Sequence, residues 1–165
     1  MSVVAVRIHK TKITIGADSV LTSGHVQEKD KFAKLIKINN LIIGQSGQSR
    51  DFTLLTLFAK NHEPREATEF DIVEYLTEYI SWCKKKIDND YKINSNFFII
   101  FKKKVFSFDA DFQIKEVKTF DAIGVGREFA LSAMYLGSSV SNAVKISCEF
   151  SAFCREPINI IEVDL

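Results

Sequence analysis

The sequence has few cysteines, and they are widely spaced. Its 165 residues include only three, Cys83, Cys148 and Cys154. This number and spacing do not fit a disulfide framework or a structural zinc site. We expect three small buried side chains in a reducing compartment, and therefore a cytoplasmic protein. The histidines also lack the spacing of metal ligands, so we expect neither a metal nor another cofactor.

The sequence also lacks an excess of either charge, a long apolar run and internal repeats. Its 22 Lys and Arg balance 21 Asp and Glu, which gives no electrostatic case for nucleic acid or membrane as the main partner. No apolar run approaches the about 18 residues of a membrane span, so we expect no such span. Arg7, His9 and Lys10 interrupt the apolar start, so we expect no signal peptide. Without a linker or repeat, residues 1–165 are predicted to form one domain.

Hydrophobic residues make up 46% of the chain, enough for a sizeable core, and the chain opens on an apolar stretch. Residues 3–8, Val-Val-Ala-Val-Arg-Ile, are typical of a strand buried on both faces. Such a strand would tether Ser2 instead of leaving it frayed. If Met1 is removed, Ser2 carries a hydroxyl beside a free α-amine, a recognised arrangement for acyl transfer. The alternative is that Ser2 is an ordinary polar residue.

The remaining periodicity predicts an alternation of strand blocks and helix pairs. Strands are expected at 2–8, 12–18, 34–38, 41–46, 96–101, 105–108, 112–117, 120–123 and 158–163. One helix pair begins near Asp51 and at a Thr68–Asp71 capping box, and the other lies beyond Gly126. We expect Phe129 to face inward and a last helix over 140–153, ended by Pro157. This order indicates an α+β fold, a four-layer αββα sandwich of two mainly antiparallel sheets.

The order and several local motifs resemble the proteasome β-subunit and bacterial HslV-like peptidase family. Counted from Ser2, Asp18 and Lys34 fall without a gap at the family's spacing for its functional Asp and Lys. The glycine turn of that family and its first helix resemble residues 43–47 and 51–54, and its glycine loop and third helix resemble residues 122–126 and 129–133. The resemblance covers nearly the whole chain and implies an N-terminal nucleophile hydrolase fold.

The resemblance also implies a role for each site residue. The Ser2 hydroxyl would attack a peptide carbonyl, and its α-amine would accept the proton. Lys34 would lower the pKa of that amine, and Asp18 would hold the Lys34 ammonium. The Gly47 N–H would stabilise the oxyanion. The implied function is a peptidase that assembles into a homo-oligomeric ring and cleaves peptides or unfolded proteins supplied by an ATPase unfoldase.

Two features leave other functions open. Val125 stands where the family usually carries a serine that hydrogen-bonds the active amine, and a valine cannot do so. The nucleophile is serine instead of the commoner threonine, and it has a free amine only if Met1 is removed. One alternative is therefore a catalytically inactive relative that serves as a structural or assembly subunit. Another is an amidase that uses the same nucleophile on a small amide.

Overall fold

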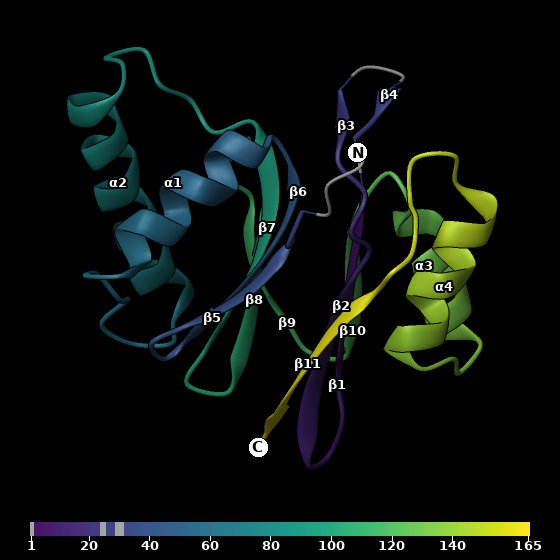
Figure 1. Ribbon diagram of the computed structural model, residues 1–165. Coiled ribbons are helices and arrows are strands. Elements are labelled where there is room, and N and C mark those ends of the chain that lie inside the picture. Colours follow the sequence, from purple (N-terminus) through teal and green to yellow (C-terminus); the bar gives the residue numbers. More distant parts are fainter. Residues whose placement is uncertain (1, 24–25, 29–31) are drawn as a thin grey trace.

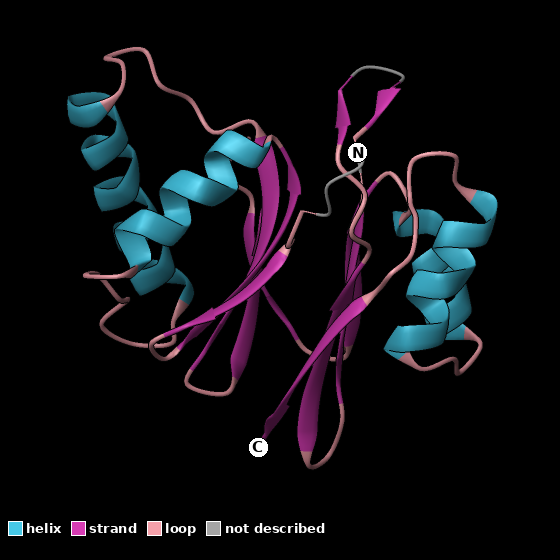
Figure 2. Cartoon of the chain, in the orientation of Figure 1, coloured by secondary structure: helices cyan, strands magenta, loops and turns pink. Residues whose placement is uncertain are grey.

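Two β-sheets face each other, and each is covered on its outer side by a pair of helices. The computed structural model shows these four layers side by side (Figures 1 and 2). It describes residues 2–23, 26–28 and 32–165. The strands pair antiparallel throughout. The predicted four-layer αββα sandwich is therefore confirmed.

The first sheet combines strands from the start and from the last third of the sequence. Its strand order is β10-β1-β2-β11, formed by β1 (Val3–Ile8), β2 (Lys12–Ala17), β10 (Phe120–Gly124) and β11 (Asn159–Asp164). Helices α3 (Arg127–Tyr135) and α4 (Val140–Phe150) cover its outer face (Figure 1). Because β1 is a central strand, Ser2 lies directly at the end of a fully paired element.

The second sheet contains the middle of the chain. Its strand order is β5-β6-β7-β8-β9, formed by β5 (Leu35–Ile38), β6 (Leu41–Gly47), β7 (Ser95–Phe101), β8 (Lys104–Phe108) and β9 (Ile114–Val117). Helices α1 (Ser49–Ala59) and α2 (Glu69–Lys86) cover its outer face (Figure 1). A short hairpin of β3 (Thr22–Ser23) and β4 (Val26–Gln27) lies between β2 and β5 in the sequence.

Strand β1 is buried on both faces, as its composition predicts. Val4 and Val6 belong to the apolar cluster between the two sheets. Val3 and Ala5 belong to the cluster under α3 and α4. All four side chains are fully buried, and burying a valine side chain stabilises a fold by roughly 1.5–3 kcal/mol. The start of the chain is thus anchored by two cores at once.

A local signal places the start of α2, but not the end of α4. The Thr68 side chain accepts a hydrogen bond from the Asp71 N–H, which confirms the predicted cap of α2. The predicted extension of the last helix to residue 153 is wrong, because α4 ends at Phe150. The chain turns away there, and the backbone N–H of Arg155 reaches the Asp18 carboxylate at 3.3 Å.

The prediction that Phe129 faces inward is also wrong. Its side chain is 38% exposed and stacks on Phe150 of α4, with ring centroids 5.9 Å apart. The inward face of α3 is formed by Ala130, Ala133 and Met134.

In the described part of the chain, no helix is both long and apolar enough to cross a membrane.

Candidate active site

Ser2 lies immediately before β1, and its backbone contacts Gly124 and Gly126. It is only 2% exposed, and its carbonyl accepts a hydrogen bond from the Gly126 N–H at 3.2 Å. Gly124 approaches it so closely that a Cβ there would lie 2.3 Å from the Ser2 carbonyl oxygen. Gly124 has φ +93°, a conformation that favours glycine. The loop between β10 and α3 therefore fixes the backbone of Ser2.

Asp18 and Lys34 form a buried ion pair next to Ser2. The Lys34 Nζ lies 2.8 Å from each Asp18 carboxylate oxygen. The same carboxylate accepts hydrogen bonds from the N–H of Val3 at 2.9 Å and from those of Val20 and Arg155 at 3.3 Å. Val3 follows Ser2 directly, so the Asp18 carboxylate binds both the Lys34 ammonium and the backbone next to Ser2.

Burial and Asp18 act on the pKa of Lys34 in opposite directions. The side chain is buried, and the loss of solvation lowers its pKa below the ordinary value of 10.5. The Asp18 carboxylate acts in the opposite direction, through its charge and its hydrogen bonds. An ammonium held in this way is a fixed positive charge that water screens poorly.

Gly47 ends β6 with φ +142°, in the region that favours glycine. A Cβ at this position would lie 2.5 Å from the Ser95 hydroxyl and 2.7 Å from the Ser95 Cα, so glycine is required on two grounds. Gly47 lines a cavity of about 350 Å³ together with Ser2 and Lys34. Three of the four predicted site residues thus face one cavity, and Asp18 binds Lys34 from the buried side.

Sequence reasoning missed Ser46. The Ser2 hydroxyl donates a hydrogen bond to the Ser46 hydroxyl at 2.8 Å, and Ser46 is buried. The period of two along β6 carries the signal. Ile42 lies in the cluster between the sheets, and Gly44 faces Val4 there, so Ser46 points the same way. Ser2 precedes Val4 by two residues and faces Ser46 across the gap.

Val125 lies in the loop after β10 and is 45% exposed. It lines a second cavity, of about 340 Å³, with Ser46, Gly47 and Gly124. The hydroxyl group that bonds Ser2 comes from β6 of the opposite sheet, while the glycine loop provides an apolar side chain. Within residues 2–23, 26–28 and 32–165, no group of three or more His, Cys, Asp and Glu residues is arranged to hold a metal ion.

The chain is similar to solved structures over its whole length. No protein-family profile matches it, and no curated protein matches its sequence. BPH from Thiobacillus denitrificans, in complex with epoxomicin, superposes with a TM-score of 0.84 at 19% identity, covering 99% of this chain and 98% of that one. BPH in another structure gives 0.83 at 20% identity, with the same coverage. Eukaryotic HslV from Trypanosoma brucei gives 0.73 at 16% identity, covering 99% of each chain. These similarities establish a proteasome- and HslV-like fold, as the sequence motifs predict.

Proposed function

We propose that this protein, which has the fold of BPH and HslV, is a peptidase subunit with Ser2 as its nucleophile. One observation carries the proposal: Ser2, Lys34 and Gly47 line the same cavity, with Asp18 bound to Lys34 behind it. A hydroxyl, a fixed cation and a backbone N–H on one cavity wall are the components that acyl transfer needs.

The proposed reaction begins with removal of Met1, which lies outside the described residues. The Ser2 Oγ attacks the peptide carbonyl while the Ser2 α-amine takes the hydroxyl proton. The new C–O bond forms a tetrahedral oxyanion, and the Gly47 N–H donates to it. The C–N bond then breaks, the leaving amine takes the proton from the α-amine, and an ester remains on Ser2. Water hydrolyses this ester by the same steps.

Lys34 and Asp18 support this chemistry electrostatically. A protonated Lys34 disfavours a second positive charge, so it lowers the pKa of the Ser2 amine and keeps part of it neutral at pH 7. Asp18 keeps the ammonium in place by accepting from it at 2.8 Å through both oxygens. The Ser46 hydroxyl, bonded to Ser2, orients the nucleophile.

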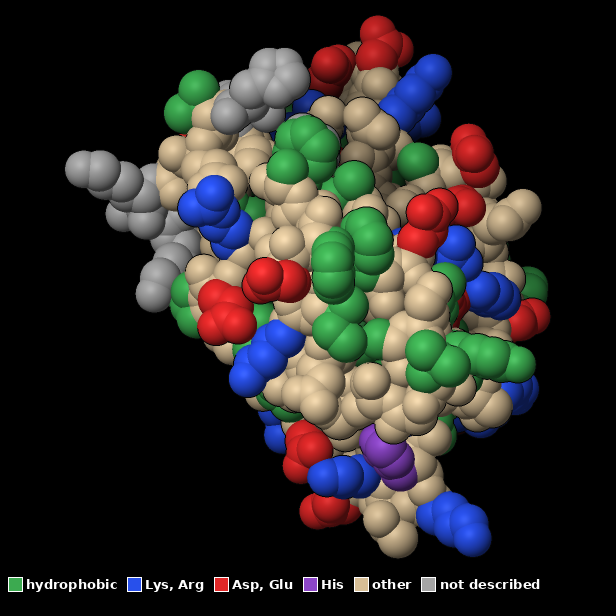
Figure 3. Space-filling view, turned by 90° about the vertical axis from the view of Figure 1, so that its right-hand side faces the viewer, with side chains coloured by type: hydrophobic (Ala, Val, Ile, Leu, Met, Phe, Trp, Pro, Cys, Tyr) green, Lys and Arg blue, Asp and Glu red, His purple; other side chains and the backbone are tan. Residues whose placement is uncertain are grey.

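The proposal includes the setting of the reaction. The substrates are peptides or unfolded proteins, which an ATPase unfoldase supplies to a ring of identical single-domain subunits in the cytoplasm. Self-association is supported by an apolar surface over α3 and α4, which Figure 3 shows as green side chains across this face. Its most exposed apolar side chains are Tyr135, Leu136 and Phe150. Light scattering that finds only monomer at micromolar concentration would contradict the ring.

A second function is favoured by Val125. The glycine loop places an apolar side chain beside the site, where a hydroxyl would assist the amine. This feature supports a catalytically inactive subunit that contributes structure or assembly to a larger complex. The amidase alternative uses the same four residues and differs only in substrate.

Peptide hydrolysis distinguishes these functions. Purified protein is first weighed by intact mass spectrometry to establish whether the chain begins at Ser2. It is then incubated with a pool of fluorogenic peptides and with small amides, beside the Ser2→Ala variant. The peptidase proposal expects Ser2-dependent release from peptides. Equal rates for the wild type and Ser2→Ala would leave the structural function, and release from small amides alone would indicate an amidase.

A further inference from the structure

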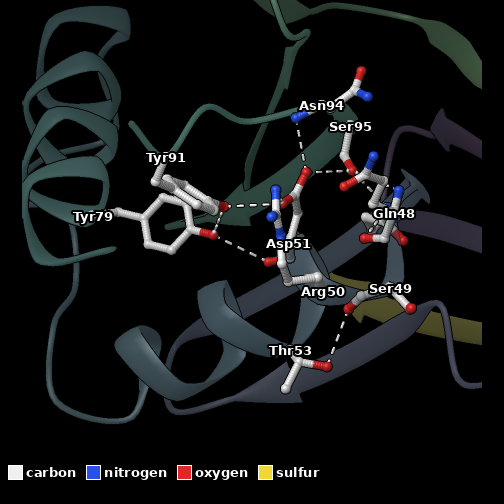
Figure 4. Close-up of polar contacts among 10 residues, drawn as sticks. Gln48, Ser49, Arg50, Asp51, Thr53, Tyr79, Tyr91, Asn94 and Ser95 are labelled. Atoms are coloured by element: carbon white, nitrogen blue, oxygen red, sulfur yellow. Dashed lines mark hydrogen bonds and ion pairs between the residues drawn. The ribbon is translucent and has the colours of Figure 1, made fainter. Parts of the chain in front are cut away.

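Asp51 is a fully buried carboxylate outside the set of proposed catalytic residues. It lies in the first turn of α1 and accepts hydrogen bonds from the Asn94 N–H at 2.8 Å, the Ser95 hydroxyl at 2.8 Å and the Tyr91 hydroxyl at 3.0 Å (Figure 4). The nearby Arg50 side chain is 52% exposed and 3.5 Å away. Burying a carboxylate among mostly neutral donors costs free energy, so the arrangement calls for an explanation beyond packing.

Ser95 links the Asp51 carboxylate to the backbone beside Gly47 through hydrogen bonds. Its only proton points to Asp51, which leaves its oxygen free to accept. It accepts from the Gln48 N–H at 2.9 Å and from the Gln45 side-chain amide at 3.0 Å. The Gln45 amide also donates to the Gln48 carbonyl at 3.1 Å. The hydrogen-bond capacity of the Ser95 hydroxyl is therefore fully used.

The Gln48 N–H belongs to the peptide unit that follows Gly47. Holding this N–H fixes the plane of the Gly47–Gln48 peptide and so restricts the ψ angle of Gly47. Gly47 is also the register partner of Ser95 in the β6–β7 ladder. Glycine has few steric restrictions on its backbone angles, and Gly47 adopts φ +142°, so contacts with its surroundings must set the orientation of its backbone.

We propose that Asp51 and Ser95 are positioning residues that hold the Gly47 N–H in the direction needed to stabilise the oxyanion. This inference rests on the proposed function and adds a supporting layer to it. Neither side chain lines the cavity that Ser2 shares with Gly47, so neither contacts the substrate there. Ser95 also lines the second cavity and accepts from the Gln45 side chain, but the proposed effect on the oxyanion passes through the Gln48 amide and the Gly47 backbone.

The test uses the p-nitrophenyl ester of an acetylated dipeptide. Acylation of Ser2 releases p-nitrophenolate in a burst, and rapid mixing over a range of ester concentrations separates its rate constant from ester binding. Ser95→Ala and Asp51→Ala are expected to slow acylation by about 10- to 100-fold with little change in binding, because removing an oxyanion donor altogether costs about 100- to 1,000-fold. Asp51→Asn should keep most of the rate, because its side-chain oxygen still accepts from Ser95.

Tyr91→Phe is the matched control. It removes a hydrogen bond to Asp51 and one to Tyr79 from the same buried cluster, but leaves the link through Ser95 intact. Its acylation rate should stay within about threefold of the wild type, when all variants are compared well below their unfolding temperatures. Hydrogen exchange gives a readout without chemistry: the Gln48 amide should exchange faster in Ser95→Ala than in Tyr91→Phe.

The outcomes separate this inference from the proposed function. A Ser2-dependent burst in the wild type with an unchanged rate in Ser95→Ala would overturn the positioning role alone. Equal slowing by Ser95→Ala and Tyr91→Phe would overturn it as well, since the effect would then reflect loss of stability. Absence of a Ser2-dependent burst in the wild type would overturn the proposed function, and the positioning role with it.

Discussion

Replacing Lys34 with methionine separates the stability of the site from its chemistry. The change keeps an unbranched apolar side chain, one atom shorter than lysine, and removes an ammonium that lies 2.8 Å from both Asp18 oxygens. Breaking a buried pair in this way typically costs about 3–5 kcal/mol, because the remaining charge is left uncompensated. Three backbone N–H groups still donate to Asp18, so we expect about 3 kcal/mol. For 165 residues this lowers Tm by about 6–12 °C.

The same substitution should slow acylation of Ser2 by about tenfold or more, since each pKa unit regained by the amine leaves about tenfold less of it neutral at pH 7. The informative partner is the double variant Asp18→Asn with Lys34→Met, which carries no buried charge. It should recover most of the lost stability, measured by thermal unfolding, while its acylation burst stays slow. Recovery of the burst rate together with stability would refute the electrostatic role of Lys34.

Three further predictions follow from the contacts around Ser2. The rate of acylation should rise with pH as the Ser2 amine loses its proton, and then stay level. Burial lowers the pKa of Lys34, so its charge is lost below pH 10.5, but the amine is already neutral there; a fall in rate on the alkaline limb would contradict a role that acts only through the amine. Ser46→Ala should slow the burst by about three- to tenfold through loss of one hydrogen bond to the nucleophile, and an unchanged rate would exclude an orienting role. Val125→Ser should accelerate it by about tenfold to a hundredfold if a hydroxyl there assists the amine, and no gain would place that assistance elsewhere.

The sequence predicts the fold well because its signals are local and consistent. The apolar run of residues 3–8 predicts a doubly buried strand, and β1 lies centrally in its sheet under α3 and α4. The Thr68 cap is likewise a local pattern with one geometric outcome. The predicted end of α4 is wrong because no local pattern marks it. The chain leaves the helix at a point that lets the Arg155 N–H reach Asp18, which is distant in the sequence.

In the candidate site, too, some residues are predicted from the sequence and others are found only in the structure. The resemblance to the peptidase family implies a role for Asp18 and Lys34, and the structure contains an ion pair between them. The sequence does not identify Ser46 as a partner of Ser2. The period of two in β6 points Ser46 between the sheets, but pairing it with Ser2 requires knowing which sheets face each other. The link from Asp51 to Ser95 joins residues 44 positions apart, and no sequence pattern indicates it.

The central claim is that Ser2 is a nucleophile with a free α-amine. The most direct measurement is mass spectrometry of protein quenched during the p-nitrophenyl ester burst, with fragmentation to locate the acyl group. The account predicts a chain that begins at Ser2 and carries one acyl group on that residue, absent from Ser2→Ala. An acyl group elsewhere in the chain, or equal acylation of the wild type and Ser2→Ala, would contradict it.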